Sequence, residues 1–169
     1  KSCKSEKDIK DILDIISRET HYDYSFIGLS CADFDNISVQ FIHNYPEKWW
    51  GEYIEKGYFK TGVMFRHCSK KCSPKHVTIK PDSIVHLSEE RNTSFIEFVS
   101  KVNTKAVSIY PQHCAGNRLG VFFLASEFAE ASDPDVIEAY EPCFNIIGVY
   151  LRDTLSRVIG TPFENIEFT

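Results

Sequence analysis

This chain has no long run of apolar residues and no excess of positive charge. No stretch approaches the roughly 18 apolar residues that cross a bilayer, and nothing resembles a cleavable signal segment. Lys and Arg number 19 against 24 Asp and Glu, which gives a formal net charge of -5. That balance argues against general electrostatic binding of nucleic acid by this part of the protein. We therefore expect no membrane contact.

The sequence also lacks the signatures of common catalytic sites. It contains no glycine-rich phosphate loop, nucleophile elbow or standard metal motif. The enzyme candidates that remain are adjacent pairs of nucleophilic or titratable residues: His67-Cys68, His113-Cys114 and Glu89-Glu90. Neighbours in an extended segment point to opposite sides, so an adjacent Cys–His pair is a poor nucleophile–base couple. We predict that the chain is not an enzyme and uses no cofactor.

The six cysteines do not form a close-spaced framework. Without a secretory signal, their scatter favours reduced thiols and a cytoplasmic location. The tightest cluster of metal-ligand types is His67, Cys68, Cys72 and His76. A zinc site could be drawn from these four residues, but they lack the paired thiols of a finger, and Pro74 interrupts the segment. We predict no metal, with zinc as the alternative.

Length and composition predict one domain with a substantial core. The chain has 169 residues, of which 43% are hydrophobic and 14% aromatic. It shows no internal repeat, low-complexity tract or linker. We therefore expect residues 1–169 to form a single domain.

The periodicity predicts helices on both sides of a group of strands. Helices are expected over residues 6–16, 46–57, 61–69, 89–102 and 134–159. Strands are expected over residues 24–29, 37–43, 76–79, 105–111 and 118–126. Residues 119–124 are apolar on both faces, which is typical of a central strand covered on two sides. This order predicts an α+β fold, a three-layer α/β/α sandwich with a central, mostly antiparallel sheet of about five strands.

The helix predicted over residues 46–57 carries an aromatic pattern. Tyr45, Trp49 and Tyr53 recur at i, i+4 and i+8, so they start on one face of the helix. An indole and two phenols suit a concave site with apolar walls and a few hydrogen-bond donors. The alternative is that these rings only fill a core.

Further residues belong to the same pattern as this aromatic helix. They are Asn44 and Pro46, Gly57-Tyr58, His67-Cys68, Pro111, Leu119-Gly120 and Pro142. Together the pattern resembles the autoinducer-binding domain of LuxR-type quorum-sensing transcriptional regulators, roughly from Tyr24 to Leu155. The resemblance implies a cytoplasmic homodimer whose sheet and helices enclose an acyl-homoserine lactone. It also implies a helix-turn-helix domain after residue 169, absent from this chain, through which the regulator would bind DNA.

The resemblance assigns roles to particular residues. Trp49 would donate its indole N–H to the lactone carbonyl, and Tyr53 its hydroxyl to the amide carbonyl, with Tyr45 as a second phenol. The residues implied to line the acyl region are Phe26, Gly28, Phe65, Phe95 and Val99. These roles agree with the chemistry, because a buried carbonyl without a donor costs a few kcal/mol.

Three positions depart from the family pattern. Gly62 falls where the family has the Asp whose carboxylate accepts the ligand amide N–H, and Val77 falls near a tryptophan on the loop that closes over the lactone. Phe123 replaces a small polar residue on the central strand. An amide N–H without its acceptor loses roughly 1–3 kcal/mol, or about ten- to a hundredfold in affinity. These changes favour a signal other than a standard lactone. Ordinary lactone sensing and a ligand-independent dimerisation domain with a filled pocket are the alternatives.

Overall fold

A five-stranded antiparallel sheet forms the middle layer of the domain, in the order β2-β1-β5-β4-β3. The computed structural model describes residues 3–33, 36–61, 63–80, 93–114 and 118–158. The strands are β1 (Tyr24–Asp33), β2 (Asn36–His43), β3 (Lys75–Thr78), β4 (Ala106–Cys114) and β5 (Arg118–Ser126). The helices are α1 (Glu6–Glu19), α2 (Glu47–Glu55), α3 (Tyr58–Thr61), α4 (Val63–Lys70), α5 (Thr93–Lys101), the 3₁₀ turn η2 (Ala129–Ser132) and α6 (Pro134–Val158).

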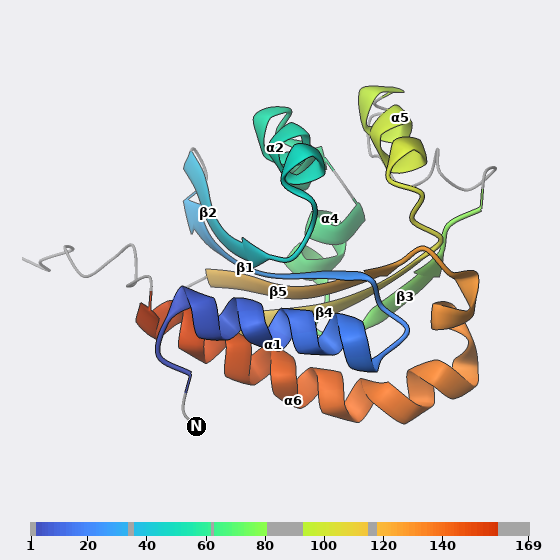
Figure 1. Cartoon of the computed structure of the whole chain (residues 1–169). Coiled ribbons are helices and arrows are strands. Elements are labelled where there is room, and N and C mark those ends of the chain that lie inside the picture. Colours follow the sequence, from blue (N-terminus) through green and yellow to red (C-terminus); the bar gives the residue numbers. More distant parts are fainter. Residues whose placement is uncertain (1–2, 34–35, 62, 81–92, 115–117, 159–169) are drawn as a thin grey trace, which may run out of the picture.

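Helices cover both faces of the sheet (Figure 1). α1 and α6 lie together against one face, and α2, α4 and α5 stand on the other. β5 lies at the centre, between β1 and β4, as its apolar residues on both faces predict. The predicted α+β sandwich is therefore confirmed.

Alternation along the strands divides the core between the two faces. On β5, Phe122 and Leu124 point to the α1/α6 layer, whereas Phe123 points to the α2/α4/α5 layer. Ile27 of β1 joins the first set and Phe26 joins the second. The two faces therefore have separate hydrophobic cores.

The α1/α6 layer is closed by an amphipathic pair of helices. The Ser5 hydroxyl caps α1 by accepting from the Asp8 backbone N–H at 3.2 Å, as the sequence predicts. Ile9, Leu13 and Ile16 of α1 are buried. α6 continues through Pro142 over 25 residues and buries Phe144 in the same core.

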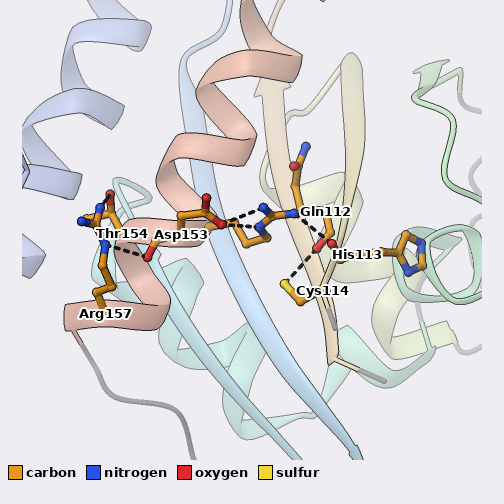
Figure 2. Close-up of polar contacts among 7 residues, drawn as sticks. Gln112, His113, Cys114, Asp153, Thr154 and Arg157 are labelled. Carbon is orange, nitrogen blue, oxygen red and sulfur yellow. Dashed lines mark hydrogen bonds and ion pairs between the residues drawn. The ribbon is translucent and has the colours of Figure 1, made fainter. Parts of the chain in front are cut away.

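α6 packs closely on β4 and forms a side-chain hydrogen bond to its backbone. Gly148 of α6 lies against the Gln112 side chain: a Cβ at this position would stand 2.6 Å from the Gln112 Nε2 atom. One turn later, Arg152 donates to the His113 carbonyl oxygen at 2.9 Å. Figure 2 shows this contact region, where β4 and α6 run beside each other. These contacts hold α6 against the face of the sheet that it shares with α1.

Several predicted boundaries shift. β1 was expected over residues 24–29 but runs to Asp33, because pairing with both β2 and β5 continues as far as Cys31. Of the helix expected over residues 61–69, residues 63–69 belong to α4, Thr61 ends α3, and residue 62 lies outside the described residues. α2 follows Pro46, and Gly57 after it takes a φ of 64°, a left-handed conformation that favours glycine. Residues 89–92 of the helix predicted over 89–102 lie outside the described residues.

No helix within the described ranges combines the length and the apolar character needed to span a bilayer.

Candidate functional site

An apolar cavity lies between the sheet and the helices α2, α4 and α5. Measured as the space open to the centre of a water-sized sphere, its volume is about 100 Å³. By that measure one water needs only about 10–15 Å³, so the cavity has room for a small organic molecule. Its lining residues are Phe26, Tyr45, Trp49, Trp50, Tyr53, Met64, Ile79, Phe95, Phe98, Val99, Val102, Thr104, Val107 and Phe123.

The aromatic helix α2 forms one wall. Tyr45, just before the helix, stacks on Tyr24 of β1 with ring centroids 5.0 Å apart. Trp49 meets the same Tyr24 ring edge-on at 5.6 Å. Tyr53, one turn further on, packs against Phe98 of α5 at 5.9 Å. All three rings line the cavity, Trp49 and Tyr53 from one face of α2 and Tyr45 from the residue before its cap.

Trp50 also lines the cavity, although the sequence analysis did not select it. Its indole lies flat on the His43 imidazole, with centroids 4.0 Å apart and planes at 18°. Burial lowers the pKa of His43, so this imidazole is neutral at pH 7. The indole also contacts Phe26 and Phe41 of the sheet, at 5.4 and 5.1 Å. Trp50 therefore attaches α2 to β1 and β2.

The sheet and α5 form the remaining walls. Phe26 of β1 and Phe123 of β5 stack at 4.9 Å, nearly parallel, across the strand pair. Phe123 thus presents a large ring to the cavity. α5 contributes Phe95, Phe98 and Val99. The Tyr58 hydroxyl and the Ser94 hydroxyl form a hydrogen bond that connects α3 with α5.

The cavity contains hydrogen-bonding groups but no charge. None of its described lining residues is charged, and the polar atoms come from two phenols, two indoles and Thr104. Burial raises the pKa of the Tyr45 and Tyr53 hydroxyls, so both are protonated donors at neutral pH. Within the described part of the chain, neither of these phenols nor either indole forms a hydrogen bond to another residue. The wall of α2 therefore offers donors to a molecule in the cavity.

Raising the pH above 10 is expected to destabilise the domain steeply. Burial raises the pKa of Tyr22, Tyr45 and Tyr53 above the ordinary value of 10.0. Above pH 10 the unfolded chain loses these protons while the folded chain keeps them. The free energy of unfolding should then fall by roughly 1.4 kcal/mol per pH unit for each such tyrosine.

Urea denaturation on both sides of pH 10, with tyrosinate absorbance as a second signal, measures this effect. We expect the absorbance of the buried phenols to appear together with unfolding. Full tyrosinate absorbance in a domain that is still folded would contradict the burial argument.

The structure brings most of the predicted site residues together. Phe26, Tyr45, Trp49, Tyr53, Phe95, Val99 and Phe123 line the cavity, while Gly28 lines a smaller one beside it. Val77, within the strand predicted over residues 76–79, lies in the edge strand β3, paired with Val107, and is not among the described residues that line the cavity. The side chain of Phe65, in α4, is not described, and Gly62 lies outside the described residues. Binding of a ligand by these residues stays a prediction.

Some lining residues were not selected from the sequence. Phe98 was accessible to sequence reasoning, since it lies three positions after Phe95 on the same helix face. Met64, Ile79 and Thr104 carry no local signal that separates a cavity wall from a core.

The enzyme candidates do not form couples. Figure 2 shows the His113 ring and the Cys114 thiol on opposite sides of β4. The His113 Nε2 atom lies 3.1 Å from the Lys71 carbonyl oxygen, and the His67 Nε2 atom lies 2.7 Å from the Ser73 carbonyl oxygen. Glu89-Glu90 lies outside the described residues. Across the described ranges, no three His, Cys, Asp or Glu side chains are placed to hold a metal ion.

A Ser–His–Glu network lies on the opposite face of the sheet. His76 Nδ1 is 2.8 Å from Ser108 Oγ, and His76 Nε2 is 2.9 Å from Glu141 Oε2. The Ser108 hydroxyl is 1% exposed and shares a 2.6 Å hydrogen bond with Tyr22. A hydroxyl enclosed in this way does not reach a substrate, so the network connects β3, β4 and α6 rather than forming a nucleophile.

A three-layer fold with an uncharged, aromatic-walled cavity against the sheet defines a small-molecule-binding domain. The sequence profile described as "Autoinducer binding domain" matches residues 5–155, and the chain belongs to that family. The resemblance to LuxR-type regulators is thereby confirmed. The family consists of regulatory ligand-binding domains rather than enzymes.

Solved structures share the fold. An N-acylhomoserine lactone dependent LuxR family transcription factor, CepR2 from Burkholderia cenocepacia, has a TM-score of 0.70 at 17% identity, over 90% of this chain and 89% of that chain. SdiA in complex with octanoyl-rac-glycerol has a TM-score of 0.76 at 16% identity, over 98% and 67%. Escherichia coli SdiA in the space group P6522 gives a TM-score of 0.75 at 15% identity, over 98% of this chain and 68% of that chain. Among curated proteins, none matches this chain.

Proposed function

We propose that this domain binds a neutral small signal molecule, with an apolar chain and a carbonyl or hydroxyl group, and that binding regulates a DNA-binding domain of the whole regulator. The observation that carries the proposal is the uncharged cavity with unpartnered indole and phenol donors on the α2 wall. These half-buried donors are free to pair with a ligand oxygen, and each such hydrogen bond adds to the affinity. The apolar walls formed by α5 and the sheet would receive the chain.

The polar end of the ligand follows from the donors. Trp49, Tyr45 and Tyr53 donate, so they suit a carbonyl, ester or hydroxyl oxygen. With Gly62 at the position of the family Asp, the expected acceptor for an amide N–H is missing. An ester or a glycerol head without an amide avoids that loss. SdiA, which shares the fold, is known in complex with octanoyl-rac-glycerol.

The second candidate is a ligand-independent regulatory and dimerisation domain. It is favoured by the stacked pair Phe26 and Phe123, which already occupies part of the space above the sheet. In that case the rings on the α2 wall stabilise the fold and bind nothing. The homodimer implied by the resemblance stays a prediction for either candidate.

A thermal-shift screen separates the two candidates. We expect a 1-acyl-rac-glycerol with a medium-length chain to raise the melting temperature, because it binds the folded state only. At a hundred times its Kd a ligand adds about 2.7 kcal/mol, or roughly 5–10 °C for a domain of this size. Circular dichroism or an extrinsic dye reports the transition.

The matched comparison is an N-acyl-homoserine lactone with the same acyl chain. We expect it to bind about ten- to a hundredfold more weakly than the glycerol ester, and Gly62→Asp to reduce that difference. Equal affinities in the unchanged domain would show that the lost acceptor does not matter. A melting temperature unaffected by every ester, lactone and host-cell extract would support the ligand-independent candidate instead.

A further inference from the structure

A smaller cavity adjoins the main one, on the side of β2. Its volume is about 20 Å³ by the same measure. Its lining residues are Gly28, Ser30, Val39, Phe41, Phe59, Met64, Cys68, Leu119 and Val121. Burial raises the pKa of the Cys68 thiol to about 12, so this group is neutral and the wall is apolar apart from Ser30. The Ser30 hydroxyl donates to the Leu119 carbonyl oxygen at 3.1 Å and is therefore already paired.

Met64 of α4 is the lining residue that the two cavities share. It is 7% exposed and belongs to one hydrophobic cluster with residues of both linings. Beside it, Phe26 of the main cavity meets Phe41 of the smaller cavity edge to face at 5.4 Å. Met64 and this ring pair therefore form the wall between the cavities.

The two parts of this wall differ in stiffness. The Phe41 ring lies over Gly28, where a Cβ would stand 2.7 Å from its Cδ1 and Cε1 atoms, so the ring is held close to the strand. Methionine is unbranched, with three rotatable bonds, and changes rotamer more easily than an aromatic ring in a stack. The movable part of the wall is the side chain of Met64, which is also the one methionine in the chain.

We propose that Met64 sets the length of the apolar chain that the domain accepts, and that the smaller cavity receives the chain end when this side chain turns aside. This specificity role rests on the proposed function. Ligands with short chains end in front of Met64, whereas longer chains must displace it. Each further methylene that becomes buried is worth roughly a fourfold gain in affinity.

Met64→Ala tests the role through chain-length preference. The probes are 1-acyl-rac-glycerols from hexanoyl to tetradecanoyl, whose Kd values are measured by displacement of a fluorescent naphthylamine. We expect the preferred chain to become longer by about two methylenes, with roughly tenfold tighter binding of the longer probes. Met64→Phe should shift the preference to shorter chains. This second variant keeps the test decisive if Met64→Ala does not fold.

The matched control is Val99→Ala, which removes volume from the main cavity at a residue that does not line the smaller one. The Val99→Ala variant should not shift the chain-length preference to the longest probes. Adding Val39→Phe to Met64→Ala should refill the smaller cavity and cancel the gain. An unchanged preference in folded Met64→Ala or Met64→Phe would overturn the specificity role and leave the proposed function intact. No binding of any probe to the unchanged domain would overturn both.

Discussion

Replacing Phe144 with alanine is expected to lower the free energy of unfolding by about 3–5 kcal/mol. The Phe144 ring is 2% exposed and lies between Tyr22, Tyr110 and Tyr140, with centroids 5.6, 5.8 and 5.6 Å away. Truncation removes its apolar contacts and leaves a cavity that neighbouring rings cannot fill without turning. Since domains are stable by only about 5–15 kcal/mol, this loss is a large fraction of the total. Urea denaturation monitored by circular dichroism measures it.

Ile146→Ala is the matched control on the same helix. Its side chain is 71% exposed, so its truncation should change the free energy of unfolding by less than about 0.5 kcal/mol. Phe144 lies in the core between α6 and the sheet, on the side away from the cavity, so folded Phe144→Ala should keep its affinity for acyl-glycerol probes. Equal destabilisation by the two substitutions would contradict the assignment of Phe144 to the core.

The second large effect is expected at the two adjacent tryptophans, which should respond differently to the same substitution. Trp49→Phe should weaken the binding of an acyl-glycerol probe about ten- to a hundredfold, because it removes an indole donor and keeps a ring. Trp49 meets the Tyr24 ring edge-on and lines the cavity, and phenylalanine keeps a ring there, so the substitution should change stability little.

Trp50→Phe should act mainly on stability. Its indole packs on His43, Phe26 and Phe41, which connects α2 to two strands. A smaller ring loses part of that contact, for an expected cost of about 1–2 kcal/mol in the free energy of unfolding.

Denaturation and probe titration on both variants decide between the two roles. The reverse result, with affinity lost in Trp50→Phe and stability lost in Trp49→Phe, would exchange the assignments. No loss of affinity in either variant would exclude an indole donor.

Much of the fold could be predicted because local patterns agreed with the final packing. Ser5 followed by the apolar stripe of α1 defines both the cap and the buried face. The doubly apolar segment of β5 occupies the centre of the sheet, where both faces are covered. Boundaries were less predictable. β1 extends beyond its apolar stretch because backbone pairing with two neighbours does not depend on side-chain type.

The site was predictable where periodicity carried it. Trp49 and Tyr53 are separated by one helical turn of α2, so their common direction follows from the helix geometry, whereas Tyr45 precedes the helix and stacks on Tyr24. Trp50 breaks that spacing and still reaches the cavity, because the wall is broad and the sheet curves beneath α2 (Figure 1). Met64 gave no signal, since its role depends on two cavities that are built by β1, β2, β4, β5, α2, α4 and α5 together.

The amino-acid sequence by itself determined the order of the elements, the family and the aromatic wall of α2, since each follows from patterns within a few helical turns or strand residues. Only the tertiary structure decided which side chains surround the cavity, that the α2 donors have no partner among the described residues, and that Met64 stands between two spaces. Cavities are formed where segments distant in sequence do not quite fill the volume between them. A local sequence pattern does not predict this unfilled volume.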